Sequence, residues 1–599
     1  MEKETLLKLK EQLEKEKEHR KILELMPKDT IYSYLVKCNS DHLEDIAINY
    51  LGNQISFEKL FDKIDLCASS LINAGVKPGD YVCLSPLTTP EGIISFYAIN
   101  KIGAIAHFIN PSMSKGEITK HIKETNSKVF ITMDLFYSEE MKKAFDEGGI
   151  RLSIITSLID SLPFGLNSDS VKYNLITAYK LHKSAVKNSK NAINWKTFME
   201  SGVLLYENYT HPFVPNSPAA VAYTSGSTGE SKGVVATNEA FNAIPVLMGL
   251  SEGSIQRQDG IFNSLPLWIY YSLGNNTHEP LCLGVTLELD PLLDVKRLDK
   301  RFKMYKFNHW NTVPHYVDLA FKGDRIKKVD FSRVKTITTG GDFLLEEVKR
   351  RADEIIKMGN GTVRVGEGYG TSEVIGCFSF QSNKSYVEGS CGKPLVGNQM
   401  MILNPENLEK VNSGESGELY IWSPTMMSGY LNNEEKNNEV FYQDASGQTW
   451  LKTGDLAHEN EYGELVPDGR IRRIVMTLDE NGFPTKIIPE KLKLVVSNHE
   501  YVEKVEAITV EDPEVITKAV LFVKLNPGVN ESEEVLESIR IYCEENLPSY
   551  MVPSPIIVVD EIPLKPSLKP DFDELEKIYH EYKTKSLSRV RSILKSKKM

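Results

Sequence analysis

The chain has 599 residues, 41% of them hydrophobic, and its 70 Lys and Arg against 82 Asp and Glu give a net charge of −12. This length predicts at least two domains of about 100–200 residues, and the acidic balance argues against nucleic acid binding by the whole chain. No apolar run approaches the roughly 18 residues that span a bilayer, and the charged first residues lack the apolar core typical of a signal peptide. Seven dispersed cysteines predict neither a zinc site nor a disulfide framework, so we expect a cytoplasmic protein.

The first half of the chain alternates between strand and helix patterns. Residues 1–25 are predicted to form an N-terminal helical extension with one apolar stripe among many Lys and Glu. Short apolar strands and amphipathic helices then follow one another up to about residue 135, which predicts an α/β fold with helices covering a parallel or mixed sheet. The elements expected there are strands at Ile46–Tyr50 and Tyr81–Leu84 and helices at Phe57–Ala74 and Gly92–Lys101.

The second half changes character near residue 468. Residues 137–205 are rich in Lys, Ser and Asn and are interpreted as partly a surface insertion, after which the alternation resumes over 218–465. Beyond it a compact α+β pattern begins, and the last twenty residues form a basic tail, interpreted as a solvated helix. We therefore predict a large domain over 26–468 and a small C-terminal domain over 469–599.

The strongest local signal is the segment 223–233, Tyr-Thr-Ser-Gly-Ser-Thr-Gly-Glu-Ser-Lys-Gly, which follows a predicted strand at Ala219–Tyr223. Its glycines allow the backbone to approach a ligand, its hydroxyls can donate to phosphate oxygens, and its lysine adds positive charge. It is not a Walker loop, because Gly-Val follows the lysine. The predicted phosphate-binding residues are Thr224, Ser225, Gly226, Ser227, Thr228, Gly229 and Lys232.

This loop resembles the signature of the adenylate-forming superfamily, which includes acyl-CoA synthetases, aryl-CoA ligases, luciferase-like enzymes and peptide-synthetase adenylation domains. It departs only at Ser231, where proline is usual. Further segments resemble the family's motifs in the same order over roughly residues 45–575: Gly340-Gly341-Asp342, Gly368–Glu373, Thr453-Gly454-Asp455, Asp468-Gly469-Arg470 and Ile562–Lys569. The resemblance is closest to acyl-CoA synthetases and implies that the C-terminal domain is mobile.

The resemblance also implies roles for these residues. Lys569, Glu373 and Lys232 are the expected catalytic residues, and Lys569 would neutralise the repulsion between a substrate carboxylate and the α-phosphate of ATP. Glu373 and Thr228 would hold Mg²⁺, and Arg472 would be the hinge between the domains. The other expected nucleotide contacts are Gly341, Asp342, Tyr369, Gly370 and Ser372 near the adenine and Asp455 and Arg470 near the ribose. Two family positions in the last motif differ, with Lys565 for threonine and Leu568 for glycine.

The acyl pocket is expected at Trp268, Ile269, Tyr270 and Gly340, with Ile269 where relatives usually carry histidine. No Asp stands at 268–271 to pair with an α-amine, so a fatty, branched or aromatic carboxylic acid fits better than an amino acid. The family's Gly-rich turn after Arg470 is replaced by a longer segment in which Asn481-Gly482 predicts a hairpin. This replacement leaves two acceptors open, CoA and the phosphopantetheine of an acyl carrier protein.

The sequence therefore predicts an acid–thiol ligase that uses ATP and Mg²⁺ to form acyl-AMP with release of pyrophosphate, and then an acyl thioester, most readily with CoA. The alternative is a non-catalytic nucleotide-binding homologue that acts as an interaction protein. Ile269, Leu568 and the replaced Gly-rich turn favour this alternative. The intact set of Lys232, Glu373, Asp455, Arg470 and Lys569 favours the enzyme.

Overall fold

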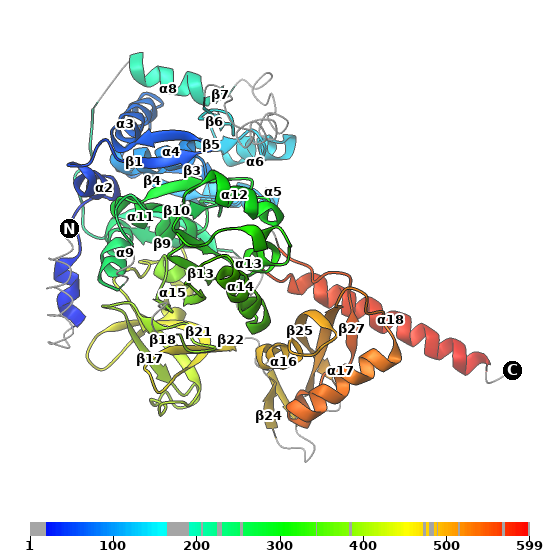
Figure 1. Cartoon of the computed structure of the whole chain (residues 1–599). Coiled ribbons are helices and arrows are strands. Elements are labelled where there is room, and N and C mark those ends of the chain that lie inside the picture. The colour runs from blue at the N-terminus through cyan, green and yellow to red at the C-terminus, as the bar shows by residue number, and fades with distance from the viewer. Residues whose placement is uncertain are drawn as a thin grey trace. The chain divides into compact units, whose positions relative to one another are not determined.

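The computed structural model describes residues 19–163, 191–204, 208–224, 231–251, 255–342, 344–381, 386–470, 475–478, 484–487, 489–512, 516–565 and 569–596. The chain divides into two compact units (Figure 1). The first contains Met1–Leu344, Val348–Met400 and Tyr420–Lys452, and the second contains Leu345–Glu347, Met401–Leu419 and Thr453–Met599. The domain boundary near 468 stays a prediction.

A nine-stranded sheet of the first unit has a parallel centre and antiparallel edges. Its central strands β14, β13, β12, β10, β11 and β1 run parallel, whereas β2 at one edge and β15 and β16 at the other pair antiparallel. In spatial order the strands are β16 (Lys393–Pro394), β15 (Ser379–Phe380), β14 (Val365–Tyr369), β13 (Thr336–Gly340), β12 (His309–Thr312), β10 (Gly260–Asn263), β11 (Thr286–Leu289), β1 (Ile46–Tyr50) and β2 (Asn53–Ser56).

An eight-stranded sheet forms the other layer of this unit. Strands β8 to β7 run parallel, and β9 and β19 extend the sheet in antiparallel pairing at one edge. In spatial order the strands are β19 (Gly429–Tyr430), β9 (Lys232–Thr237), β8 (Pro218–Thr224), β4 (Ile105–Phe108), β3 (Tyr81–Ser85), β5 (Val129–Met133), β6 (Leu152–Thr156) and β7 (Ala192–Asn194).

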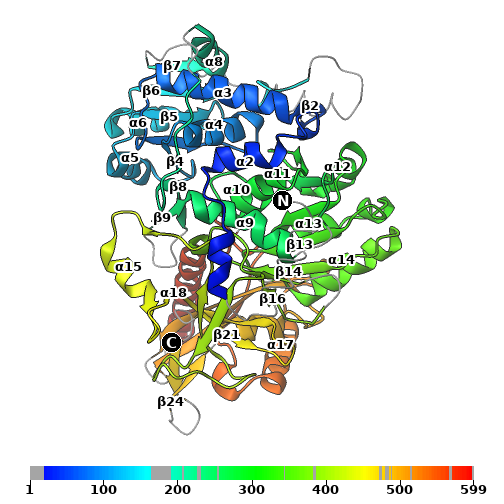
Figure 2. The ribbon, with the colours of Figure 1, turned by 90° about the vertical axis from the view of Figure 1, so that its left-hand side faces the viewer.

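Helices fill the space between the two sheets and cover their outer faces. Every residue of α4 (Pro90–Lys101) is buried. Its Phe96 packs against Phe108 of β4 and against Phe241 of α9 (Asn238–Ser251). Helices α5 (Lys115–Thr125) and α6 (Glu139–Gly148) lie side by side and share an apolar core with β3, β5 and β6 (Figure 2). The other helices described in this unit are α2 (Ile31–Asn39), α3 (Phe57–Asn73), α8 (Trp195–Leu204), α10 (Tyr270–Leu273), α11 (Glu279–Cys282), α12 (Leu298–Met304), α13 (Pro314–Phe321), α14 (Glu346–Met358) and α15 (Glu434–Val440).

A five-stranded sheet lies where the chain divides between the units. Its order is β17 (Gln399–Leu403), β18 (Gly417–Trp422), β21 (Thr449–Glu459) and β20 (Phe441–Gln443), and β22 (Leu465–Arg470) also pairs with β21. Both β20 and β22 pair antiparallel with β21. The division between the units passes through β17, β18 and β21.

The rest of the second unit is built on β25 (Val502–Asp512), β26 (Ile516–Leu525) and β27 (Ile556–Val558). Both faces of β26 are buried: Ala519, Leu521 and Val523 pack with α16 (Pro489–Val496) and α17 (Glu533–Asn546), and Val520 and Phe522 pack with α18 (Phe572–Ser596). The two strands β23 (Val475–Leu478) and β24 (Pro484–Ile487) pair antiparallel, as the hairpin prediction requires, and their connecting residues 479–483 lie outside the described part.

The predicted fold class is confirmed, since helices cover parallel and mixed sheets and a small unit of sheet and helix follows. One local prediction needs correction. Of the predicted helix 1–25, the structure describes only His19–Leu25, and these residues form a 3-10 helix. Within the range 137–205, interpreted as partly a surface insertion, residues 137–163 and 191–204 supply α6, β6, β7 and α8, and 164–190 lie outside the described residues. Strand β14 covers Val365–Tyr369 and so includes part of a predicted nucleotide motif.

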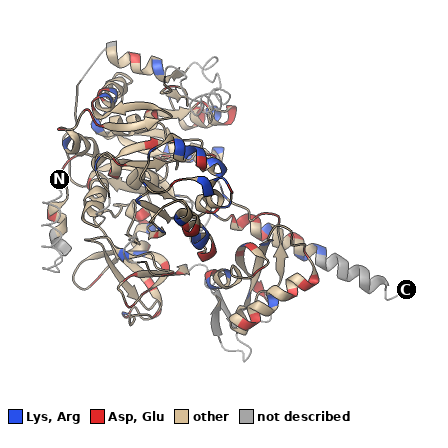
Figure 3. Cartoon of the chain, in the orientation of Figure 1, with Lys and Arg blue, Asp and Glu red and all other residues tan. Residues whose placement is uncertain are grey.

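The net negative charge is unevenly spread over the described residues. Lys and Arg gather on α12, whose sequence is Leu-Asp-Lys-Arg-Phe-Lys-Met, and acidic side chains predominate on α17 (Figure 3). No helix among the described residues is long and apolar enough to cross a membrane. The described part of the chain likewise contains no cluster of three or more His, Cys, Asp or Glu that could hold a metal.

Two buried histidines predict that acid destabilises the first unit. The pKa of both His107 and His278 is lowered from 6.5 to about 3, by burial in each case and, for His107, also by the nearby His121. Between these two values the unfolded chain binds protons that the folded chain does not, so the free energy of unfolding decreases as the pH falls. Each histidine contributes about 1.4 kcal/mol per pH unit within this window.

We therefore expect His278→Gln to unfold with a shallower acid dependence than the wild type. Urea titrations between pH 7 and pH 4 would measure this difference, which should change by about 1.4 kcal/mol per pH unit below pH 6. Parallel curves for the two proteins would contradict it.

Candidate active site

The two flanks of the predicted phosphate loop lie next to each other. Strand β8 ends at Thr224, β9 begins at Lys232, and these two residues are paired across the antiparallel ladder. The loop therefore leaves the sheet and returns to it at one place. Ser225, Gly226, Ser227, Thr228 and Gly229 lie outside the described residues.

One tyrosine connects Lys232 with Glu373. Lys232 Nζ lies 4.8 Å from the centre of the Tyr430 ring, and the Tyr430 hydroxyl donates a hydrogen bond of 2.8 Å to Glu373 Oε1. A cation over an aromatic face is attracted by the ring's negative charge distribution. The backbone supports this arrangement, because Tyr430 pairs with Val234 of β9 and the Met427 N–H donates to the Glu373 carbonyl at 2.7 Å. The structure thus brings two predicted catalytic residues together in a Lys232–Tyr430–Glu373 row.

The predicted adenine segments lie at the carboxyl ends of two neighbouring parallel strands. Gly340 ends β13 and pairs with Gly368 of β14, and a Cβ at Gly340 would lie 3.0 Å from the Gly368 carbonyl oxygen. Gly341 follows with a φ of +85°. The carboxyl ends of parallel strands are where open α/β sheets commonly bind ligands. The predicted contacts found at this edge of the sheet are Gly340, Gly341, Asp342, Tyr369, Gly370 and Ser372.

The turn between Tyr369 and Glu373 has little room for other residues. A Cβ at Gly370 would lie 2.2 Å from the Gly376 carbonyl oxygen, so glycine is required there. A 3-10 turn over Ser372–Val374 then presents Ser372 and Glu373, both partly exposed. The hydroxyl of Thr371 is buried with no hydrogen-bond partner among the described residues. A buried polar group of this kind is expected where water or a ligand completes a site.

Apart from Gly340, which ends β13, the predicted acyl-pocket residues lie at the start of α10. Tyr270 is only 2% exposed, and its hydroxyl donates to the Val234 carbonyl at 2.8 Å, next to the phosphate-loop flank. Trp268 is partly exposed and meets the Phe136 ring edge to face, with 6.0 Å between the ring centres. Ile269 immediately precedes α10. The role of these residues as a substrate pocket stays a prediction.

In the second unit, the predicted ribose contacts are neighbours on adjacent strands. Asp455 of β21 pairs with Arg470 of β22, and the Asp455 N–H donates to Thr453 Oγ1 at 3.1 Å. Asp455 is buried, with 6% of its surface exposed. Further along the same two strands, His458 Nδ1 lies 3.0 Å from both carboxylate oxygens of Asp468. Arg472, the predicted hinge, lies outside the described residues.

Lys569 is exposed on a short loop that closes on itself. The loop leaves the apolar face of the sheet at Ile562 and rejoins it at Phe572, where α18 begins. The Lys565 N–H donates to the Lys569 carbonyl at 2.8 Å, and Leu564 forms a bridge with Pro570. The loop is therefore fixed at its base by two packed residues and by backbone pairing.

Comparison with known families matches both parts of the chain. The family described as AMP-binding enzyme matches residues 36–431, and the family described as AMP-binding enzyme C-terminal domain matches residues 494–569. The chain belongs to the AMP-binding enzymes. The predicted resemblance to the adenylate-forming superfamily is confirmed.

The curated relatives of this AMP-binding enzyme include ligases for two kinds of acid. A long-chain-fatty-acid–CoA ligase of Bacillus subtilis is 26% identical over 90% of this chain and 92% of its own length. A 4-coumarate–CoA ligase of Nicotiana tabacum is 23% identical over 84% and 85%. The solved anthranilate CoA ligase AuaEII, in complex with anthranoyl-AMP, has the same fold, with a TM-score of 0.76 at 19% identity over 93% of this chain and 98% of its own.

Tyr430 is the residue of this AMP-binding enzyme whose place in the site the sequence did not reveal. The segment Pro424–Tyr430 has the family's spacing, which by itself predicts only a place in the framework near the nucleotide. Its hydroxyl nevertheless contacts Glu373, which lies 57 residues away in the chain. The signal that could have found it is an aromatic hydroxyl at the end of a segment with family spacing.

We expect Tyr430→Phe to lower kcat/KM for ATP about tenfold, since a hydrogen bond to a charged group contributes about 1.5 kcal/mol. The phenylalanine keeps the ring beneath Lys232, so Tyr430→Leu should be worse. Steady-state kinetics with Tyr442→Phe as the control would measure both effects. Equal kinetics for Tyr430→Phe and the wild type would contradict a role for the hydroxyl.

Proposed function

We propose that this AMP-binding enzyme is an acid–thiol ligase that activates a carboxylic acid with ATP as acyl-AMP, releases pyrophosphate and transfers the acyl group to a thiol. The observation that carries the proposal is the Lys232–Tyr430–Glu373 row at the base of the predicted phosphate loop. The CoA ligases among its relatives, aligned over most of their length, support it.

The proposed chemistry requires charge compensation. The substrate carboxylate and the α-phosphate of ATP are both anionic, so their approach needs positive charge in the transition state. We assign this role to Lys569, with Lys232 balancing the charge of the triphosphate. Thr224 and the loop hydroxyls would bind phosphate oxygens, and Asp455 and Arg470 would hold the ribose. Rotation of the C-terminal domain about Arg472 would then separate the two half-reactions.

The residues around Glu373 fit a magnesium ion. Mg²⁺ in nucleotide sites is commonly bound by one or two carboxylates together with substrate phosphates. Glu373 is partly exposed, and Tyr430 occupies only one of its carboxylate oxygens among the described residues. When bound, the ion would neutralise phosphate charge, with Glu373 and the hydroxyl of Thr228 as its protein ligands.

The acid that we propose is fatty, branched or aromatic. The segment 268–271 is Trp-Ile-Tyr-Tyr and offers no carboxylate to an α-amine. The relatives named above act on long-chain fatty acids and on 4-coumarate, which are both apolar acids without an α-amine. Buried apolar pockets discriminate against charged groups that lack a partner.

CoA is the proposed acceptor, and the phosphopantetheine of a carrier protein is the second candidate. The fold alone does not select between acceptors, because the structural neighbours include CoA ligases and the amide bond synthetase McbA of Marinactinospora thermotolerans (TM-score 0.74, 19% identity, 92% of this chain and 100% of its own). The CoA ligases among the curated relatives favour CoA.

Pyrophosphate release tests the proposed function. The purified chain would be assayed with Mg²⁺·ATP and a panel of long-chain, branched and aromatic acids, each with and without CoA. We expect the chain to release pyrophosphate with one class of acid and to form acyl-CoA only when CoA is present. Nucleotide binding without turnover of any acid would favour the non-catalytic homologue instead.

A further inference from the structure

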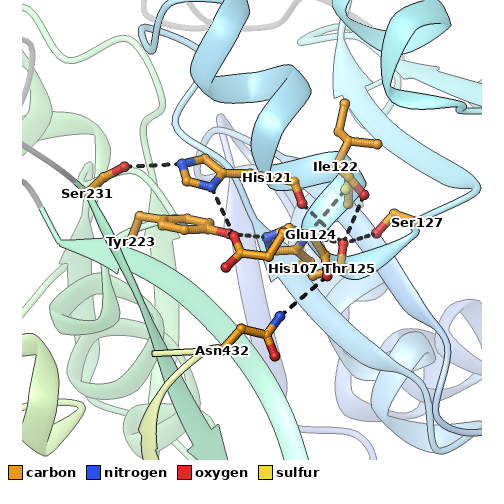
Figure 4. Close-up of polar contacts among 10 residues, drawn as sticks. His107, His121, Ile122, Glu124, Thr125, Ser127, Tyr223, Ser231 and Asn432 are labelled. Carbon is orange, nitrogen blue, oxygen red and sulfur yellow. Dashed lines mark hydrogen bonds and ion pairs between the residues drawn. The ribbon is translucent and has the colours of Figure 1, made fainter. Parts of the chain in front are cut away.

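A polar cluster joins helix α5 to both ends of the predicted phosphate loop (Figure 4). The ring of His121 stacks on the ring of Tyr223, with 3.7 Å between centroids, and its Nε2 lies 3.1 Å from Ser231 Oγ. Tyr223 is the residue before Thr224 on β8, and Ser231 is the residue before Lys232 on β9. One side chain from a separate helix therefore contacts the strand where the loop leaves and the residue where it returns.

The partners of His121 define which atoms donate. Glu124 Oε2 lies 3.3 Å from His121 Nδ1 and accepts a second hydrogen bond of 3.3 Å from the Tyr223 hydroxyl. A carboxylate only accepts, so Nδ1 of a neutral His121 carries the proton and Nε2 accepts from the Ser231 hydroxyl. Burial and the negative charge of Glu124 raise the pKa of Tyr223, which keeps its hydroxyl protonated.

His107 contacts Tyr223 on the side of the cluster away from Ser231. His107 Nε2 lies 2.9 Å from the Tyr223 oxygen, and its Nδ1 lies 3.1 Å from Thr125 Oγ1. With its pKa lowered to about 3, His107 is neutral at physiological pH and can donate to the Tyr223 oxygen. His121 itself is only 2% exposed. The ring that meets Ser231 is thus held in one orientation by Glu124 and Tyr223.

We propose that His121 is a positioning residue that closes the base of the phosphate loop by binding Ser231, and so presents the loop to the triphosphate of ATP. This inference rests on the proposed function, in which residues 224–232 bind the phosphates. Ser231 stands where the signature has proline, which would fix φ at this position. A serine leaves φ free, and the hydrogen bond that its hydroxyl donates to a buried imidazole supplies the missing restraint.

The expected consequence concerns nucleotide affinity. Restraining Ser231 also restrains the backbone next to Lys232, which then loses less conformational entropy when Lys232 binds a phosphate. The loss of the hydrogen bond between Ser231 and His121 should weaken ATP binding about three- to tenfold. The KM for the carboxylic acid and the thermal stability should change little when Ser231 alone is altered, because Ser231 is partly exposed.

A set of variants on the full chain tests the proposal by equilibrium binding of ATP and by the KM for ATP in pyrophosphate release. Ser231→Ala and His121→Asn should each raise both constants about three- to tenfold, and the double variant should be no worse than either single one. His121→Gln, whose amide can reach the position of Nε2, should lie close to the wild type. Lys123→Ala, an exposed change on the same helix, is the matched control.

The two proposals fail in different ways. The role of His121 would be overturned if Ser231→Ala left the ATP affinity unchanged. It would also be overturned if the effects of Ser231→Ala and His121→Asn on ATP affinity multiplied in the double variant. A loss of thermal stability in His121→Asn without a change in ATP affinity would likewise overturn it. A wild-type chain that binds ATP but releases no pyrophosphate with any acid would refute the ligase, while the binding series would still decide the role of His121. A wild-type chain that binds no ATP would overturn both.

Discussion

Lys569→Ala is expected to reduce the rate of acyl-adenylate formation by about 10²–10³-fold, the cost of removing one group that stabilises developing charge in a transition state. Lys569 is exposed on its closed loop, so its replacement should leave the fold and the thermal stability unchanged. Pyrophosphate release measured at saturating ATP and acid would show the loss. The effect should lie mainly in kcat, because the charge acts in the transition state more than in binding.

Lys565→Ala is the matched control for this prediction. Lys565 belongs to the same loop, is also a lysine, and forms a 3.1 Å ion pair with Asp573 at the start of α18. Both variants remove one positive charge, so any difference between them reports the position of the charge. We expect Lys565→Ala to keep most of the wild-type rate. Equal losses in the two variants would contradict the assignment of Lys569.

A second measurement separates the two half-reactions. When preformed acyl-AMP and CoA are supplied, the transfer step does not require the charge of Lys569, and Lys569→Ala should form acyl-CoA at a rate near that of the wild type. A parallel loss in this transfer step would indicate a general defect of the site and would argue against a role confined to adenylation.

The sequence predicts elements well where one apolar pattern decides the structure. The strands at β8 and β9 flank the phosphate loop where an apolar run breaks and resumes, and α17 lies where the helical period is regular. Both results depend on local patterns of burial, which alternate every two or every 3.6 residues. The Gly-rich loop between β8 and β9 is recognisable because its chemistry depends on adjacent residues.

Elements defined by long-range packing are missed. Strand β14 reads Val-Gly-Glu-Gly-Tyr, and two glycines argue against a strand from local propensity. The strand forms because it lies between β13 and β15, and the close approach of Gln381, whose carbonyl oxygen would be 3.1 Å from a Cβ at Gly366, favours a glycine. Likewise Lys349 of the highly charged α14 would be read as a surface residue, yet it is fully buried and pairs with Glu367 at 3.0 Å.

The residues of the candidate site likewise include some that the sequence reveals and some that only the fold reveals. Motif residues such as Lys232 and Glu373 can be found in the sequence, because each lies in a short segment with characteristic neighbours. Their common contact, Tyr430, and the ring of His121 behind Ser231 come from distant parts of the chain. Such contacts depend on how the sheets are assembled, which no local pattern encodes.

Glu373→Gln is expected to raise the Mg²⁺ concentration needed for half-maximal pyrophosphate release and to lower kcat/KM for Mg²⁺·ATP by about 10²-fold, the consequence of removing about 2.7 kcal/mol of charge stabilisation. The amide oxygen of Gln can still accept the Tyr430 hydrogen bond, so the Lys232–Tyr430–Glu373 row should keep its geometry. The variant therefore isolates the charge of the carboxylate from its packing.

Binding of Mn²⁺, measured by electron paramagnetic resonance in the presence of ATP, gives a readout that does not depend on turnover. The wild type should bind one ion more tightly than ATP alone does, and Glu373→Gln should lose this difference, whereas Glu373→Asp should keep part of it because the charge remains. Tyr430→Phe keeps the carboxylate and should reduce the affinity for Mn²⁺ only slightly. An unchanged affinity in Glu373→Gln would show that the carboxylate serves the fold and not the ion, since the hydrogen bond to Tyr430 would then be its only function among the described contacts.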